Sequence, residues 1–207
     1  MNVLTAVRRP EPVLDRERER RLTDRQRELL DQLGRMFDEG FADLTMAEIA
    51  GRLNCSMRTL YALGPSRDQL VLIVVDRNLW RIGRCAQRAI LPDMAPLEAL
   101  AAYLKAAHDA VAEMTQAFAR DLEAVPAAQR LQDAHTEYLL AMTRQLLDLA
   151  VERGDIVPVD TAAAARVLGR LGRDFARPDV MPTLGSPPRA AADTMVEVVL
   201  RGLRTGA

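Results

Sequence analysis

The sequence predicts an all-α fold, and three observations lead to this prediction. Hydrophobic residues make up 49% of the 207 positions and aromatic residues only 4%. The core must therefore be built mainly from Ala, Leu and Val, a mixture that favours helices over strands. Helix-start signals recur along the chain and are followed by apolar residues at helical spacing, and no stretch shows the alternation of a strand.

Composition also limits the class of protein. The 28 basic and 29 acidic side chains leave no global excess of charge to indicate a partner. Two cysteines, Cys55 and Cys85, are too few for a disulfide framework, so we expect reduced thiols in a cytoplasmic protein. No apolar run approaches the roughly 18 residues of a membrane helix, and the N-terminus lacks the pattern of a secretory signal. We therefore expect no membrane partner.

Residues 1–21 are polar, contain Pro10 and Pro12, and interleave arginines with acidic residues. Nothing in this stretch looks able to fill a core, so we expect a flexible arm. Alternatively, its last part, from about Asp15, extends the first helix backwards.

The first clear helix begins at Thr23. Thr23 and Gln26 match a capping box, in which each side chain bonds to a backbone N–H of the other residue. Apolar residues then recur at helical spacing up to Gly40, which is a good C-terminal stop.

A pair of short helices follows. Thr45 and Glu48 form a second capping box, Asn54 tolerates a left-handed backbone, and Ser56 can cap the next helix. Residues 41–64 therefore read as helix, four-residue turn and helix, the geometry of a helix-turn-helix, whose second helix enters the major groove of DNA.

The rest of the chain predicts further helices. Ser66 caps a long one that reaches about residue 90, and its first turns are apolar all round, so it is buried on more than one side. Pro and Gly residues separate the other predicted helices, which span about 96–113, 115–124, 127–153, 160–177 and 189–204.

The segment from Phe41 to Leu70 resembles the TetR family of bacterial transcriptional regulators. Residues 45–50 are similar to the start of that family's second helix, residues 55–61 to its recognition helix, and residues 66–70 to the start of its fourth helix. Three positions depart from the pattern: Asn54 and Arg58 replace small residues, often Gly, and Gly64 replaces an aromatic residue.

The resemblance implies a domain organisation. It places a three-helix, helix-turn-helix DNA-binding head at residues 22–66. A C-terminal helical bundle for ligand binding and dimerisation takes up residues 67–207. The implied partners are double-stranded DNA, an unknown small-molecule ligand and a second copy of the chain.

The predicted DNA contacts lie on and around the recognition helix. Arg58 can donate two hydrogen bonds to a guanine edge, a pairing worth ~1–3 kcal/mol of base discrimination, although a solvated surface arginine is the alternative. Met57 and Thr59 can contact a thymine methyl group or the sugar-phosphate wall. Phosphate contacts suit four further residues, which are Thr45, Ser56, Tyr61 and Arg67.

The net charge of the head gives little indication of DNA binding. Residues 1–67 carry 12 basic and 11 acidic side chains. The arginines of the arm can enter the minor groove, and a plain solvated tail is the alternative.

The ligand pocket is predicted from apolar stripes. His108 and His135 both fall on such stripes, where they are either satisfied core histidines or parts of a pocket wall. The same wall would include Trp80, Tyr103, Tyr138 and Met142. We expect no metal and no cofactor, because no His, Cys, Asp and Glu residues cluster with ligand spacing.

The dimer interface is predicted on the last two helices, where Gly169 and Gly172 allow close approach. The resemblance implies a two-fold dimer through a four-helix interface, with the apolar residues Leu168, Leu171, Phe175, Val196, Val199 and Leu203.

These observations favour a dimeric, ligand-responsive DNA-binding regulator that acts as a repressor on a palindromic operator. An enzyme is disfavoured because the sequence has no nucleophile elbow, phosphate-binding Gly loop or paired catalytic motif. The third hypothesis is a ligand-binding or scaffold protein whose helix-turn-helix no longer binds DNA specifically.

Overall fold

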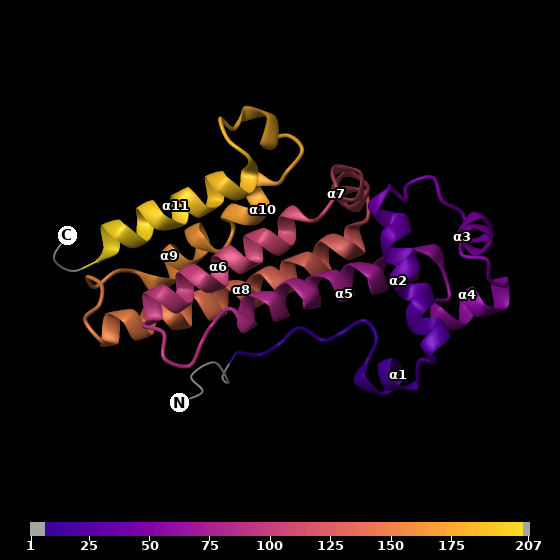
Figure 1. The fold of residues 1–207 in the computed structure, drawn as a ribbon, viewed down its shortest axis with the longest axis horizontal. Coiled ribbons are helices and arrows are strands. Elements are labelled where there is room, and N and C mark those ends of the chain that lie inside the picture. The colour runs from indigo at the N-terminus through magenta and orange to yellow at the C-terminus, as the bar shows by residue number, and fades with distance from the viewer. Residues whose placement is uncertain (1–6, 205–207) are drawn as a thin grey trace. The chain divides into compact units, whose positions relative to one another are not determined.

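A computed structural model describes residues 7–204 (Figure 1). This part of the chain is helical without a strand, and one isolated antiparallel bridge joins Ile156 to Arg204. The elements are α1 (Arg16–Arg21), α2 (Asp24–Asp38), α3 (Met46–Arg52), α4 (Met57–Leu63), α5 (Arg67–Arg88), α6 (Pro96–Ala112), α7 (Gln116–Glu123), α8 (Pro126–Glu152), α9 (Thr161–Leu168), α10 (Leu171–Phe175), the 3-10 helix η2 (Met181–Thr183) and α11 (Pro188–Leu203). The predicted all-α fold is confirmed.

The helices form two compact units. We call residues 10–79 and 114–133 the head unit, and residues 7–9, 80–113 and 134–204 the body unit. The helix-turn-helix lies in the head unit. The division differs from the expected boundary at residues 66 and 67, because the start of α5 and the whole of α7 pack with the head.

Helix α2 of the head unit begins where the sequence predicts. The Thr23 N–H donates to Gln26 Oε1 over 2.9 Å, and the Gln26 N–H donates to Thr23 Oγ1 over 3.2 Å, which confirms the first capping box. The core of the unit is apolar and comes from every helix between α2 and α5, together with α7. Its largest fully buried side chains include Phe37, Phe41 and Phe118.

The N-terminal stretch differs from the expected arm. Asp15 caps α1, a separate short helix, and Leu14 is only 6% exposed within the head core. The Val13 N–H donates to Asp76 Oδ2 on α5 over 3.0 Å. The expectation that nothing in residues 1–21 can fill a core is therefore wrong for Val13 and Leu14, since apolar residues next to a capped helix can reach a core that already exists. Residues 1–6 of the expected arm lie outside the described residues.

The body unit has its own core. It combines the second half of α5, α6, most of α8, and α9 and α11, with α11 packed on α6 and α10 (Figure 1). Tyr103, Met142 and Leu147 are among its buried residues. None of the helices in residues 7–204 combines the length and the hydropathy of a membrane span.

The predicted helix over residues 160–177 is wrong as one element. Asp160 caps it as expected, but α9 ends at Leu168 and α10 begins at Leu171. Gly169 lies at the break, where a Cβ atom would come within 2.6 Å of a Leu140 methyl group and 2.8 Å of a Leu139 methyl group. The close approach to α8 requires a residue without a side chain at this position. Because glycine also weakens a helix, the predicted single helix is interrupted here.

Candidate nucleic-acid interface

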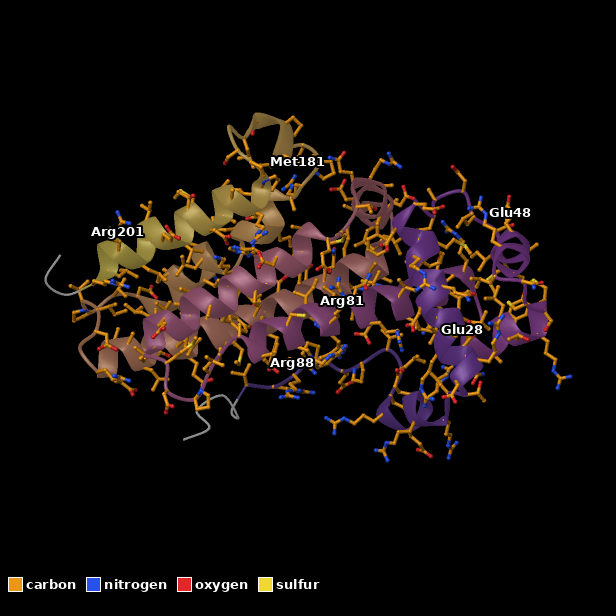
Figure 2. The ribbon with its side chains drawn as sticks, viewed as in Figure 1. Glu28, Glu48, Arg81, Arg88, Met181 and Arg201 are labelled. Carbon is orange, nitrogen blue, oxygen red and sulfur yellow. The ribbon has the colours of Figure 1, made fainter. Side chains whose placement is uncertain are left out.

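The first helix of the motif, α3, starts at a complete capping box. The Thr45 N–H donates to Glu48 Oε2 over 2.8 Å, and the Glu48 N–H donates to Thr45 Oγ1 over 3.3 Å. The Thr45 N–H and hydroxyl hold the pKa of Glu48 below its ordinary value. Figure 2 labels Glu48 on α3. Thr45 is exposed, so a phosphate could reach it, although its hydroxyl already bonds to Glu48 over 2.7 Å.

The turn between the helices has the predicted left-handed residue. Asn54 has a φ of 47°, and it is the non-glycine residue with positive φ among residues 7–204. The turn is bonded back to α3, since the N–H of the next residue, Cys55, donates to the Ala50 carbonyl over 3.0 Å. Cys55 is half-buried, and desolvation raises the pKa of its thiol, which suits a structural thiol.

The second helix, α4, buries one side and exposes the other. Ser56 caps it by accepting a hydrogen bond from the Thr59 N–H over 3.1 Å. Leu60 and Leu63 are buried in the head core. Most of the other residues are exposed, including Met57, Arg58 and Tyr61, while Thr59 is half-buried. The predicted DNA-contact residues of this helix therefore lie where a duplex could reach them.

Arg67, which the sequence predicts as a phosphate contact, makes contacts within the head. Its Nη2 donates to the carbonyl oxygens of Phe41 over 2.6 Å and of Ala42 over 2.7 Å, and its guanidinium carbon lies 5.8 Å from the centre of the Phe41 ring. The guanidinium thus holds the loop between α2 and α3. Sequence spacing missed this role because the two carbonyls lie 26 and 25 positions away.

Two further residues of the head were not found from the sequence. Arg18 of α1 donates to the Leu63 carbonyl, at the end of α4, over 3.1 Å. Asp121 of α7 accepts hydrogen bonds from the N–H groups of Phe41 and Ala42. A signal for Asp121 was present, because it lies among the apolar residues of its helix, next to Leu122 in the sequence.

The residues predicted for a ligand pocket all lie in the body unit, in two groups. In the first group the ring centres of Trp80 and His135 are 5.2 Å apart, edge to face. Gln87 Nε2 donates to the Tyr138 hydroxyl over 2.6 Å. Tyr103 and Met142 are buried in the core of the body unit. Desolvation raises the pKa of the Tyr103 hydroxyl well above its ordinary value.

His108 belongs to a separate cluster. Its Nδ1 lies 2.7 Å from Asp193 Oδ1 on α11, and a Cβ atom at Gly172 would come within 2.5 Å of its ring. The ring is buried between α6, α10 and α11. This supports the core-histidine interpretation of His108, because the half-buried carboxylate of Asp193 satisfies the buried ring.

The predicted interface residues differ in their burial. Leu168 and Val196 are buried in the core of the body unit, so the prediction is wrong for them. Leu171, Phe175, Val199 and Leu203 are half-buried. The exposed apolar residues of α9 and α11 are Val167, Met195 and Val198, with Val198 55% exposed. At Leu168 and Val196 the apolar side of the helix therefore faces the core of the body unit and not a partner.

Solved structures match this arrangement over most of the chain. A TetR transcription regulator from Haloarcula marismortui has a TM-score of 0.72 at 18% identity, covering 89% of this chain and 100% of its own. A TetR-family regulator from Thermus thermophilus has a TM-score of 0.61 at 22% identity, covering 86% and 99%. A TetR regulator from Streptomyces coelicolor has a TM-score of 0.53 at 25% identity, covering 88% and 99%.

The chain has the TetR-family fold. No family model matches its sequence, and no curated protein matches it either. The assignment therefore depends on the three-dimensional arrangement of the helices.

Two of the departures from the TetR pattern have a structural explanation. Asn54 supplies the left-handed turn that a glycine commonly supplies in this fold. Gly64 lies at the tight junction of α4 and α5, where a Cβ atom would come within 2.8 Å of a Leu70 methyl group. An aromatic side chain at position 64 would therefore not fit this TetR-fold head without repacking.

Proposed function

We propose that the chain is a ligand-responsive transcriptional repressor that binds a palindromic operator as a homodimer. The observation that carries the proposal is α4 itself. It is a short helix held on one side by Leu60 and Leu63, with Met57, Arg58 and Tyr61 exposed on the other. A helix of this kind after a tight turn is the element that a helix-turn-helix places in the major groove.

Arg58 is the main candidate for base recognition. It is exposed on the first turn of α4, and its guanidinium can bond to both acceptors of a guanine. Ser56, Thr45 and Tyr61 are candidates for phosphate contacts, which fix register without reading sequence. Arg67 contributes to this interface indirectly, by holding the loop before α3.

A dimer would supply the specificity that one short helix lacks. Two copies related by a two-fold axis would place their α4 helices in successive major grooves, ~34–36 Å apart. The exposed residues Val167, Met195 and Val198 support an interface through α9 and α11, because apolar side chains on exposed helix faces are stabilised by burial against a partner.

A small-molecule ligand is proposed for the core of the body unit. The Trp80 indole N–H and the Thr143 hydroxyl are buried without a hydrogen-bond partner, and Thr143 has no exposed surface. Buried polar atoms are usually satisfied, so these two are available to a ligand that could bond to them. Such a ligand changes DNA binding only if it has different affinities for two conformations of the protein.

Selection of bound fragments from random DNA tests the proposal directly. A regulator of this kind yields a palindrome whose half-sites are about one helical turn apart. Titration of the selected site at several salt concentrations should show log affinity falling with log salt, and Arg58→Ala should relax base preference. Equal binding to all sequences would instead favour a scaffold protein that has lost specific DNA binding.

A second measurement tests the ligand response. Candidate small molecules are screened by the shift in unfolding temperature, and those that stabilise the protein are added to a DNA titration. A ligand that binds tightly and leaves DNA affinity unchanged contradicts the coupling.

A further inference from the structure

The loop between α2 and α3 is held from both sides. Asp121 Oδ2 accepts the Phe41 N–H over 2.5 Å and the Ala42 N–H over 2.8 Å. On the carbonyl side, Arg67 Nη2 donates to the oxygens of the same two residues over 2.6 and 2.7 Å. Two successive residues of this loop, Phe41 and Ala42, are therefore bonded through both their N–H and their carbonyl groups to two charged side chains from distant parts of the chain.

The Asp121 carboxylate is buried, since the residue is only 7% exposed. A buried charge is unfavourable unless hydrogen bonds compensate for the loss of water. Burial by itself raises the pKa of Asp121, but the N–H groups of Phe41 and Ala42 and the guanidinium of Arg120 outweigh it and hold the pKa below its ordinary value of 3.8. The loop N–H groups are thus the main compensation for keeping this charge in the head.

The residues around the Asp121 carboxylate allow the loop to approach it closely. Gly40 has a φ of 110°, and a Cβ atom there would come within 3.2 Å of Asp121 Oδ2. The Phe41 ring packs against Phe118 of α7, with ring centres 5.6 Å apart. Thr115, the N-cap of α7, donates a hydrogen bond to the Asp38 carbonyl at the end of α2. Helix α7 therefore contacts the loop through polar and apolar groups together.

We propose that Asp121 is a positioning residue for the helix-turn-helix. By fixing the amide groups of Phe41 and Ala42, it sets the path of the chain that leads to the Thr45 cap and hence the orientation of α3. Because α3 packs on α4, the same contact fixes the recognition helix. This inference rests on the proposed DNA-binding function and adds to it a residue that lies outside the motif.

Hydrogen bonds are suited to this role because they are directional. Apolar contacts such as that of Phe118 hold α7 near the loop, but they tolerate small rotations of the backbone. Two N–H groups that converge on one carboxylate oxygen fix the orientation of both peptide planes, since such bonds weaken steeply as they bend.

The test compares Asp121→Ala and Asp121→Asn with a matched control, Glu123→Gln. Glu123 lies on the same helix and is exposed, so its substitution removes the same charge without touching the loop. Amide hydrogen exchange is measured across the full chain, and affinity for the selected operator is measured well below the unfolding temperature.

Asp121→Ala is expected to accelerate exchange at Phe41, Ala42 and the amides of α3, and to weaken operator binding by about tenfold or more. Asp121→Asn keeps one acceptor oxygen, so its values should lie between those of Asp121→Ala and the unaltered protein. Glu123→Gln should match the unaltered protein in exchange. In the unaltered protein, the NMR chemical shifts of the Phe41 and Ala42 amide protons should change with pH as the Asp121 carboxyl group titrates.

Each failure has a distinct meaning. Unchanged exchange in both Asp121 variants would overturn the proposal, and so would faster exchange with operator affinity equal to that of Glu123→Gln. If Asp121→Ala does not fold, Asp121→Asn decides between the same outcomes. If the unaltered protein binds no selected DNA, the proposed function fails, and exchange in α3 alone decides whether Asp121 fixes the helix-turn-helix.

Discussion

The guanidinium of Arg18, on α1, donates a hydrogen bond to the carbonyl oxygen of Leu63, the last residue of α4, over 3.1 Å. The last carbonyl groups of a helix have no partner within it, and a positive charge is favourable there. A short N-terminal helix that no motif includes therefore caps the end of the candidate recognition helix.

The first prediction concerns this cap. Arg18→Ala should lower the free energy of unfolding by about 0.5–1.5 kcal/mol, because a charged donor to the Leu63 carbonyl is lost. Arg16→Ala is the control, since Arg16 is exposed on the same helix. Urea unfolding followed by circular dichroism measures both, and equal effects of the two substitutions would contradict the prediction.

The second prediction concerns the turn of the helix-turn-helix. Asn54→Val should destabilise the protein by roughly 1–2 kcal/mol, because a branched residue is strained at the φ of 47° that Asn54 adopts. Asn54→Gly should be nearly neutral, since glycine adopts positive φ without strain. Thermal unfolding of the two variants gives the comparison, and a more stable Val variant would exclude a left-handed turn at this position.

The third prediction separates two arginines that the sequence alone assigns to DNA. Arg58→Ala should leave stability unchanged and weaken binding to the preferred site by ~1–3 kcal/mol. Arg67→Ala should instead lower the free energy of unfolding, because the carbonyls of Phe41 and Ala42 lose their donor. Unfolding and DNA titration are measured on both variants. A stable Arg67→Ala protein with weak DNA binding would restore a direct phosphate contact for Arg67.

The fourth prediction distinguishes the exposed from the buried stripe of α11. Val198→Asp should shift the proposed dimer to monomer, because it places a charge on the exposed apolar face. Val196→Ala should instead lower the stability of the body unit by about 1–3 kcal/mol, since Val196 is buried in its core. Sedimentation over a range of protein concentrations reports the oligomeric state, and a dimer that survives Val198→Asp would place the interface elsewhere.

The fifth prediction follows from the lowered pKa of Asp121. A carboxyl group whose pKa is lower in the folded state stabilises the protein above its unfolded pKa, and this stabilisation is lost as the pH falls through the folded value. The stability difference between the protein and Asp121→Asn should therefore be constant above about pH 5 and shrink below about pH 4. Urea unfolding across this range measures the difference, and a gap that widens with acid would contradict the assignment.

Local features of the sequence determined the helix starts and the turn of this protein. The capping boxes at Thr23 and Thr45, the caps at Ser56 and Asp160, and the left-handed Asn54 are all found as predicted. Each depends on groups within a few positions of one another, so the residue types and their spacing are sufficient to specify them.

The tertiary structure decided everything that depends on distant partners. Asp121 and the Phe41 N–H it accepts lie 80 positions apart, and the carbonyls bound by Arg67 lie in a different loop. The break at Gly169 depends on side chains of α8, and the choice between Leu168 and Val167 as the outer residue of α9 depends on which side the core occupies. Helical spacing shows that a residue lies on a stripe, but only the packed neighbours decide whether that stripe faces the core, a partner or water.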